Sequence, residues 1–212
     1  MNTGERDYTP GETPGAKRVA AMRFEIKKKW GPATQKHKRL LDALREVLPD
    51  DAVIATDTTQ LVYSGSYCFP IRRPRTWLTP MGYSPLGYAL PAAIGAKIAK
   101  PDRPVVCLIG DGGIQFTLPE LVTAVEQKIP LAVVIWNNEG YGEIRDYMDA
   151  RDIPQIGVNL HTPDFLTIAK GFGCKAERST SLDHFKKLIK FSDTGNVPTV
   201  IEVREDATFL AS

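Results

Sequence analysis

The chain has 212 residues, of which 42% are hydrophobic and 25% are charged, as is ordinary for a soluble globular domain. Its formal net charge of +2, from 27 basic and 25 acidic residues, gives no reason to expect a nucleic-acid partner, and no apolar run is long enough to cross a bilayer. Three widely spaced cysteines argue against a disulfide framework and a zinc site and, with an N-terminus unlike a signal peptide, predict a cytoplasmic protein.

Residues 1–33 are rich in Gly, Pro, Thr and charge and have no sustained apolar period, which predicts a linker or extension. The basic run from Lys27 to Lys29 precedes Trp30, and a run this short is typical of a solvated surface. The folded domain is therefore expected to comprise residues 34–212.

The first predicted element of this domain is a helix that starts at Thr34 and ends before Pro49, because Leu40, Leu41 and Leu44 share one face. Short apolar runs at 52–55, 77–78, 105–109, 131–136 and 199–203 then read as buried strands. Helical segments at 86–99, 118–126, 165–171 and 182–191 alternate with them. Uninterrupted apolar strands separated by helices indicate a sheet covered on both faces. The predicted fold class is α/β, a doubly wound, mostly parallel sheet with helices on both faces.

A glycine-rich turn, Gly110-Asp111-Gly112-Gly113, lies between a predicted buried strand and a predicted helix. Ligands of doubly wound sheets bind at the carboxyl ends of the strands, and glycines let the backbone approach a phosphate closely. A turn that merely closes a strand-to-helix connection is the alternative. Nucleotide binding is disfavoured, because the chain has neither a GxxxxGK[ST] loop nor a GxGxxG fingerprint.

Asn137 and Asn138 follow the next predicted strand, with Gly140 just beyond. Asp111 and Asn138 are 138 − 111 = 27 positions apart, so one right-handed strand-helix-strand crossover brings both to one edge of the sheet. A carboxylate, an amide oxygen and a carbonyl at Gly140 are hard donors that suit Mg²⁺ or Ca²⁺. In the alternative interpretation the asparagines only cap a helix and Asp111 only occupies a turn.

The motif Gly110-Asp111-Gly112, followed at this spacing by Asn137-Asn138, resembles the signature of enzymes that use thiamine diphosphate. The resemblance extends from about Lys38 to Glu202. It implies the C-terminal, diphosphate-binding domain of the acetolactate synthase and 2-oxo acid decarboxylase family. Asp111, the Asn138 side chain and the Gly140 carbonyl would then ligate Mg²⁺, which bridges the two phosphates of the cofactor. Backbone N–H groups would meet the phosphate oxygens at Gly112, Gly113, Ile114 and Tyr141.

The stretch MGYSPLGYALPAAIGAKIA resembles the family segment that contacts the cofactor's pyrimidine ring. Leu86 would be the apolar wedge that bends the cofactor, and the Ser84 carbonyl would accept a hydrogen bond from its amino group; a first-turn core position is the alternative for Leu86. In ATDTTQLVY, Thr59 and Gln60, with Thr58 as a further candidate, match a loop that wraps the terminal phosphate. The expected cofactor-binding residues are Thr59, Gln60, Ser84, Leu86, Gly110, Asp111, Gly112, Gly113, Ile114, Asn138, Gly140 and Tyr141.

In this family the glutamate that activates the cofactor belongs to a separate pyrimidine-binding domain, and we find no second α/β unit here to supply it. The resemblance therefore implies a fragment of a homo-oligomeric 2-oxo acid decarboxylase or carboligase; a small subunit of a split decarboxylase and a cofactor-binding module inactive on its own are the alternatives. Tyr147 replaces the tryptophan of acetolactate synthases, and Ile144 replaces an acidic residue of pyruvate decarboxylases. These departures favour another 2-oxo acid as substrate. If Glu143 faced the pocket it could select a cationic one, whereas an exposed Glu143 would have no special role.

Overall fold

The computed structural model describes residues 13–211, and its contacts divide the chain into two compact units, Met1–Gln35 and Lys36–Ser212. In the first unit, helix α1 (Pro14–Lys27) begins after Thr13, whose Oγ1 accepts a hydrogen bond from the Ala16 N–H, and the helix buries none of its residues. The segment predicted as a linker thus contains a helix, and the unit boundary falls two residues after the expected one. The rest of that prediction, residues 1–12, and Ser212 lie outside the described residues.

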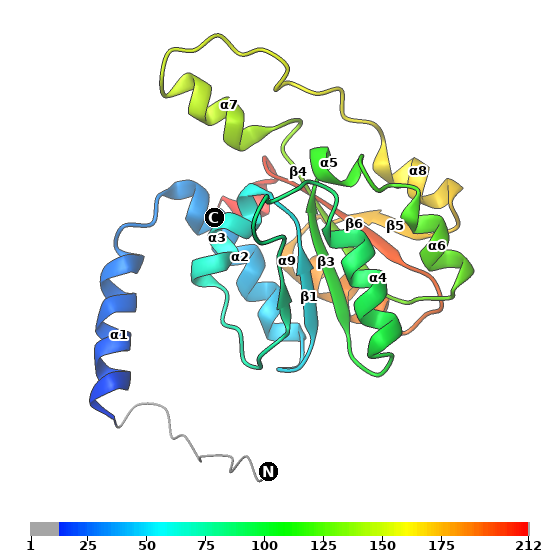
Figure 1. Cartoon of the computed structure of the whole chain (residues 1–212), viewed down its shortest axis with the longest axis horizontal. Coiled ribbons are helices and arrows are strands. Elements are labelled where there is room, and N and C mark those ends of the chain that lie inside the picture. The colour runs from blue at the N-terminus through cyan, green and yellow to red at the C-terminus, as the bar shows by residue number, and fades with distance from the viewer. Residues whose placement is uncertain (1–12, 212) are drawn as a thin grey trace. The chain divides into compact units, whose positions relative to one another are not determined.

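The second unit contains a parallel sheet of six strands in the order β2-β1-β3-β4-β6-β5 (Figure 1). The strands are β1 (Val53–Thr56), β2 (Trp77–Leu78), β3 (Val105–Gly110), β4 (Ala132–Asn137), β5 (Lys175–Arg178) and β6 (Thr199–Arg204). Every residue of β1, β3 and β4 is buried, which explains why these strands are apolar without alternation. The predicted α/β class with a mostly parallel sheet is confirmed. The sequence KAER did not suggest β5, because this edge strand is polar and partly exposed.

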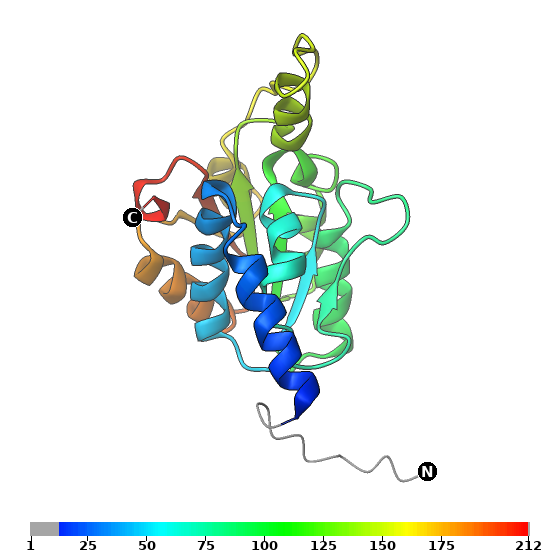
Figure 2. The same ribbon diagram turned by 90° about the vertical axis from the view of Figure 1, so that its left-hand side faces the viewer.

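Helices cover both faces of the sheet, as predicted (Figures 1 and 2). On one face lie α2 (Pro32–Val47), α3 (Gln60–Cys68) and α9 (Leu182–Ser192), and on the other lie α4 (Ala89–Ala99), α6 (Glu120–Glu126) and α8 (Phe165–Gly171). Successive residues of a strand point to opposite faces, so Val105 and Cys107 join the core beneath α4, while Val106 and Leu108 join the core beneath α2. The two cores fix the strands and hence the edge at which they end.

Two short helices lie at the carboxyl ends of the strands. Helix α5 (Asp111–Ile114) follows β3 directly, and α7 (Gly142–Asp149) lies beyond the end of β4 (Figure 1). A 3₁₀ turn, η1 (Thr208–Leu210), follows β6. Neither α3 nor α7 was predicted as a helix, and the helix expected to begin at Leu86 begins at Ala89. No helix between residues 13 and 211 combines the length and the apolar character that a membrane span needs.

His37 on α2 is a buried polar residue of the second unit, with 4% of its surface exposed. Its Nδ1 lies 2.8 Å from Ser64 Oγ, and its ring meets the Trp136 ring edge-on at 4.9 Å. Nε2 has no hydrogen-bond partner within the described part of the chain. Burial lowers the pKa of His37 from 6.5 to about 4, so the folded domain holds this ring neutral.

Candidate functional site

A cavity lies at the carboxyl ends of β1, β3 and β4. The chain passes outward from β1 to β2 and then returns to β3 on the other side of β1, so this is the point at which the strand order reverses. Such switch points are where open α/β sheets bind ligands. The expected cofactor-binding residues that line the cavity are Thr59, Gln60, Ser84, Leu86, Gly110, Asp111, Gly112, Gly113, Asn138, Gly140 and Tyr141. Ile114 does not line it: its side chain is buried in the core beneath α4, and its expected role concerned only its backbone N–H.

Asp111 is the first residue of α5 and is 1% exposed. Its Oδ2 accepts a hydrogen bond of 2.9 Å from the Gly140 N–H and lies 3.4 Å from Thr162 Oγ1. Burial raises the pKa of Asp111, and hydrogen bonds from the N–H groups of Gly140 and Gly112 lower it in part. A buried carboxylate in this environment favours a bound cation.

With the Asn138 amide oriented by its hydrogen bond to Gln60, three oxygen atoms of Asp111, Asn138 and Gly140 converge with no donor between them. Asn138 Nδ2 donates to Gln60 Oε1 at 2.9 Å, and this leaves Asn138 Oδ1 facing the Gly140 carbonyl oxygen at 2.8 Å and Asp111 Oδ1 at 3.1 Å. Turning the amide by 180° would convert both contacts into hydrogen bonds. In an octahedral Mg²⁺ site with bonds of about 2.1 Å, adjacent ligand oxygens are about 3.0 Å apart. Asn138 Oδ1 therefore lies at the distance of a neighbouring ligand from each of the other two oxygens.

The donor set also limits which metal fits. Among residues 13–211, no group of three or more His, Cys, Asp or Glu side chains could hold a metal. The three oxygens supply one carboxylate, one amide and one carbonyl, which are hard ligands with a single negative charge. Mg²⁺ commonly binds in this way and completes its coordination with phosphate oxygens and water. The residues present fit Mg²⁺ held together with a polyanion.

Two glycines of the cavity have no room for a side chain. A Cβ at Gly113 would lie 2.8 Å from Asp57 Oδ2, and Gly140 has a φ of +146° that a larger residue rarely adopts. A Cβ at Gly140 would also collide with the Val158 carbonyl oxygen. The Tyr141 N–H, expected to meet a phosphate, donates instead to that same carbonyl at 2.9 Å. This hydrogen bond uses the Tyr141 N–H, which was one of the expected phosphate donors.

Asp57 belongs to the site, although the sequence did not single it out. It follows β1, is 1% exposed, and accepts hydrogen bonds from the Thr58 N–H at 2.8 Å and the Gly87 N–H at 2.7 Å. It thereby ties the end of β1 to the residue after Leu86. An acidic residue directly after a fully buried strand is the signal that could have revealed it.

The loop around Leu86 forms one wall of the cavity. Leu86 is half-buried, and Ser84 has a left-handed φ of +49°. The Ser84 carbonyl, expected to face the cofactor's amino group, accepts a hydrogen bond of 3.1 Å from Thr58 Oγ1. Thr59 is the N-cap residue of α3, but its side chain makes no capping hydrogen bond and lies beside Gly110.

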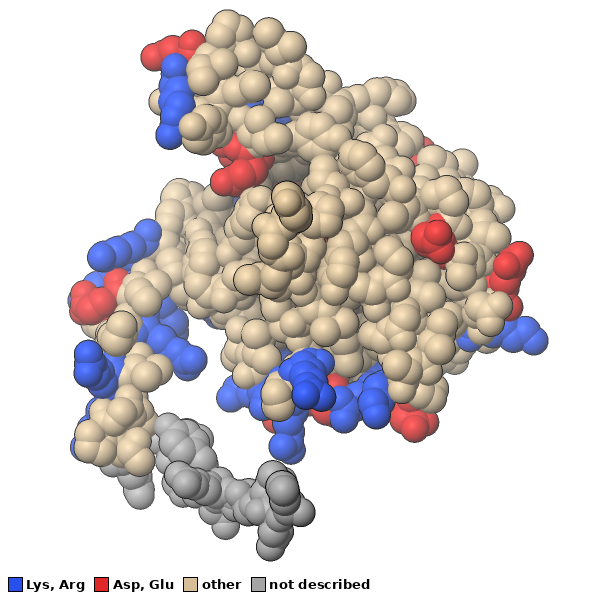
Figure 3. Space-filling model, viewed as in Figure 1, with Lys and Arg blue, Asp and Glu red and all other residues tan. Residues whose placement is uncertain are grey.

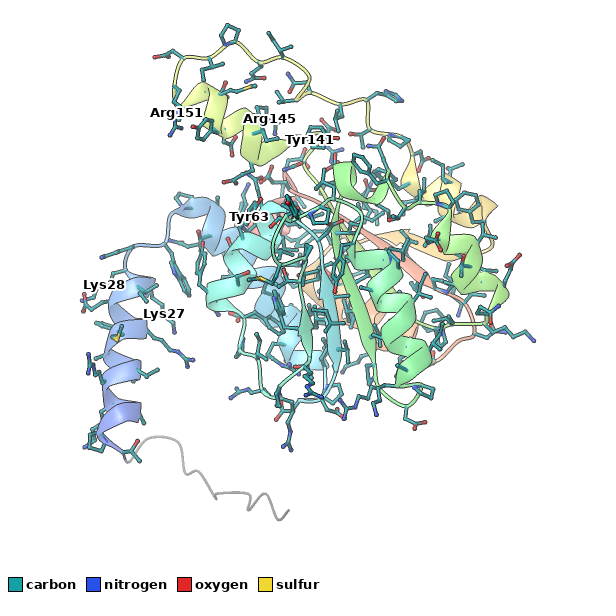
Figure 4. The ribbon with its side chains drawn as sticks, in the orientation of Figure 1. Lys27, Lys28, Tyr63, Tyr141, Arg145 and Arg151 are labelled. Atoms are coloured by element: carbon teal, nitrogen blue, oxygen red, sulfur yellow. The ribbon has the colours of Figure 1, made fainter. Side chains whose placement is uncertain are left out.

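The outer wall of the cavity comes from α3 and α7. Tyr63, Glu143 and Ile144 line it; Tyr63 was not an expected site residue, whereas Glu143 was expected to have a role only if it faced the pocket. Figure 4 shows Tyr63 and Tyr141 on opposite sides of the gap beneath α7, and Figure 3 shows acidic side chains at the hollow there. Burial, together with the charge of Glu143, raises the pKa of Tyr63. Glu143 thus lines the mouth of the cavity and is at the same time exposed to solvent.

Comparison with known proteins identifies the family. Residues 57–203 match the family model described as the thiamine pyrophosphate enzyme, C-terminal TPP binding domain. The chain belongs to this family. The matched residues begin directly after β1 and include β2 to β5, β6 except its last residue, and both motifs of the cavity.

Relatives of this TPP-binding domain are much longer proteins. The Pseudomonas aeruginosa protein named "Probable 2-ketoarginine decarboxylase AruI" is 43% identical over 192 residues, which are 90% of this chain and 34% of that protein. Acetolactate synthase isozyme 1 large subunit of Escherichia coli is 34% identical over 81% of this chain and 31% of its own length. The chain thus spans about a third of the length of these curated relatives.

A solved structure supports the same assignment. The thiamine diphosphate-dependent 4-hydroxybenzoylformate decarboxylase of Rhodococcus jostii RHA1 superposes with a TM-score of 0.73 and 30% sequence identity. The superposition covers 79% of this chain and 32% of that one. The fold of the TPP-binding domain is therefore that of a known thiamine diphosphate enzyme.

Proposed function

We propose that this chain binds thiamine diphosphate through Mg²⁺ and is the diphosphate-binding part of a 2-oxo acid decarboxylase or acetolactate synthase-like carboligase. The observation that carries the proposal is the position of the Asn138 amide, 2.8 Å from the Gly140 carbonyl oxygen and 3.1 Å from Asp111 Oδ1, with its oxygen turned toward both by the hydrogen bond to Gln60. A divalent cation stabilises this arrangement, and the diphosphate supplies the remaining negative charge.

The residues around the three oxygens would then bind the rest of the cofactor. Backbone N–H groups of Gly112, Gly113 and Ile114, with Thr59 and Gln60, would contact the phosphates, because they surround the same end of the cavity. Leu86 would hold the cofactor bent, and its loop is fixed by Asp57. When bound, the cofactor would supply a nucleophilic carbon and an electron sink for the decarboxylation of a 2-oxo acid.

The rest of the active site would come from a pyrimidine-binding domain, on the remainder of a longer chain or on another subunit of a homo-oligomer. The chain spans about a third of its relatives, and apolar side chains near the cavity are exposed, with Met81 at 85% and Tyr83 at 101%. Exposed apolar groups beside a site favour contact with another protein surface. The alternative assembly is a split enzyme in which this chain is the small subunit.

For the substrate we propose a 2-oxo acid with a cationic side chain. The relative named for 2-ketoarginine shares 43% identity, and Glu143 supplies a carboxylate at the mouth of the cavity. Tyr147 and Ile144 still distinguish this chain from acetolactate synthases and pyruvate decarboxylases by the resemblance. A guanidinium group of the substrate would pair with Glu143 as a charge-assisted hydrogen bond.

Isothermal titration of the chain with thiamine diphosphate, with Mg²⁺ and again with a chelator, tests the proposal. We expect binding that depends on Mg²⁺ and disappears with the chelator. Equal affinity in both buffers would contradict the metal site. Absence of binding to the chain both alone and together with a pyrimidine-binding domain would contradict the cofactor assignment.

A further inference from the structure

A chain of hydrogen bonds leads from the three oxygens to the exposed side of α7. Asn138 Nδ2 donates to Gln60 Oε1 at 2.9 Å, and Gln60 Nε2 donates to Asp146 Oδ2 at 2.8 Å. We call Asp146, Gln60 and Asn138 the amide relay. Two of its members were expected at the cofactor, whereas Asp146 matches no motif and does not line the cavity.

The direction of the amide relay is set at its outer end. An ionised carboxylate only accepts hydrogen bonds, so Asp146 requires Gln60 to turn its Nε2 outward and its Oε1 inward. The inward Oε1 then requires Asn138 to turn its Nδ2 toward Gln60, which points Asn138 Oδ1 at Asp111 and Gly140. If Asn138 turned over, Gln60 would have to turn as well and would present its Oε1 to the Asp146 carboxylate.

Without a cation, the reversed orientation has a local advantage. Asn138 Nδ2 would then donate to the Gly140 carbonyl at 2.8 Å and to Asp111 Oδ1 at 3.1 Å. In that orientation the amide would no longer offer an oxygen to a metal. Asp146 opposes this reversal, because the repulsion of two acceptors at the outer end offsets the hydrogen bonds gained at the inner end.

The backbone of α7 leaves space for the amide relay and is bonded to it. Gly142 leaves the space that the Asn138 and Gln60 amides occupy: a Cβ there would collide with Asn138 Nδ2 and lie 2.8 Å from Gln60 Oε1. From the same helix, Arg145 Nη2 donates to the Asn138 carbonyl at 3.2 Å. Helix α7 thus holds the main chain of Asn138 through Arg145 and its side chain through Asp146 and Gln60.

We propose that Asp146 is a positioning residue that keeps the Asn138 amide oxygen turned toward the cation. This inference deepens the proposed function and rests on it for the metal. Asp146 acts through two amides and does not touch the cation or the cofactor. Partners one step removed from a metal typically change its affinity by about 10-fold to 100-fold, and Asp146 is a step further away and exposed, so we expect about 3-fold to 10-fold.

The test compares Asp146→Asn with Asp149→Asn, a control on the same helix. The change of charge is the same, but Asp149 accepts from Gln155 Nε2 and not from Gln60. With Asn at 146, the outer end can donate as well as accept, so the relay can reverse. Titration with thiamine diphosphate should show about 3-fold to 10-fold weaker Mg²⁺-dependent binding for Asp146→Asn. Asp149→Asn should bind like the parent, and residual binding in chelator should be equal in all three proteins.

A second measurement needs no ligand and separates the two proposals. In the free chain, the side-chain NH₂ signals of Asn138 in a ¹⁵N–¹H NMR spectrum should move in Asp146→Asn and stay in place in Asp149→Asn. Unmoved Asn138 signals would overturn the role of Asp146, whatever the binding data. If the signals move in Asp146→Asn but the parent binds no cofactor, alone or with a pyrimidine-binding domain, the relay is supported and the proposed function is contradicted. Equal Mg²⁺-dependent affinity of parent and Asp146→Asn would overturn the relay alone.

Discussion

Asp111 carries the only formal charge among the three converging oxygens, and its Oδ2 also holds the Gly140 N–H. Asp111→Ala removes both the metal ligand and this hydrogen bond. We therefore expect Mg²⁺-dependent binding of thiamine diphosphate to weaken by more than about 100-fold, beyond the usual effect of residues one step from a metal. Calorimetric titration measures this, with Asp149→Ala as the control. An unchanged affinity in Asp111→Ala would refute the metal assignment.

His37 predicts how the stability of the domain depends on pH. Its pKa is lowered by burial to about 4, so below pH 6.5 the unfolded chain binds a proton that the folded chain does not. The stability contributed by the neutral ring is complete above pH 6.5 and is lost as the pH falls from 6.5 toward 4, by up to about 3 kcal/mol. Urea unfolding at pH 7.5, 6 and 5 should show this decline in the parent and a smaller one in His37→Gln. Parallel declines in the two proteins would rule out His37 as the cause.

The site residues differ in how readily the sequence revealed them. Asp111 and Asn138 were predicted because residue type, spacing and position after a strand all agreed. Asp57 and Asp146 were missed because their roles depend on partners 30 and 86 positions away along the chain, which no local pattern encodes. The hydrogen bond from the Tyr141 N–H to the Val158 carbonyl could not be predicted either, because the long connection after α7 brings Val158 back to Tyr141.

At the scale of the elements, the glycines of α5 leave the space that this short helix needs to pack beside the end of β1. A Cβ at Gly113 would press on the Asp57 carboxylate, whereas a Cβ at Gly95 in α4 would meet no atom within 4 Å. We expect Gly113→Ala to destabilise the domain by about 1–3 kcal/mol, as overpacking does. Gly95→Ala should stabilise it by up to about 1 kcal/mol, since Ala is the better helix former. Thermal and urea unfolding of both variants measure this, and a neutral Gly113→Ala would show that Asp57 can move aside.

Buried elements were predicted from the sequence, and exposed ones were missed. The strands of the two cores are apolar on both sides and were found within a residue or two, as was α2 with its apolar face. Helices α3 and α7 were missed as helices because exposed apolar residues, Tyr67 on α3 and Ile144 and Tyr147 on α7, obscure the apolar period. Helix α1 buries nothing, so no apolar face marked it.

At the scale of the whole molecule, the proposed function calls for a second domain before substrate preference can be measured. In an enzyme assembled with its pyrimidine-binding domain, Glu143→Gln should raise the KM for 2-ketoarginine about 10-fold, because a charge-assisted hydrogen bond becomes a neutral one. The KM for an uncharged 2-oxo acid should stay within about 2-fold, since that substrate makes no such bond. Steady-state decarboxylation assays measure both. Equal changes for the two substrates would exclude Glu143 as a selector of cationic substrates.

The pairing of β3 with β4 has a consequence for folding. Gly110 pairs with Trp136 in this register, so Asp111 and Asn138 meet only when the two central strands are correctly aligned. The unfolded chain has no such meeting point, and a ligand held there binds only the native state. Its binding free energy is therefore added to the unfolding of the entire sheet, and at 100 times its Kd it would contribute about 2.7 kcal/mol. The melting temperature at rising cofactor concentration would thus report the alignment of the whole sheet, including strands such as β6 that do not line the cavity.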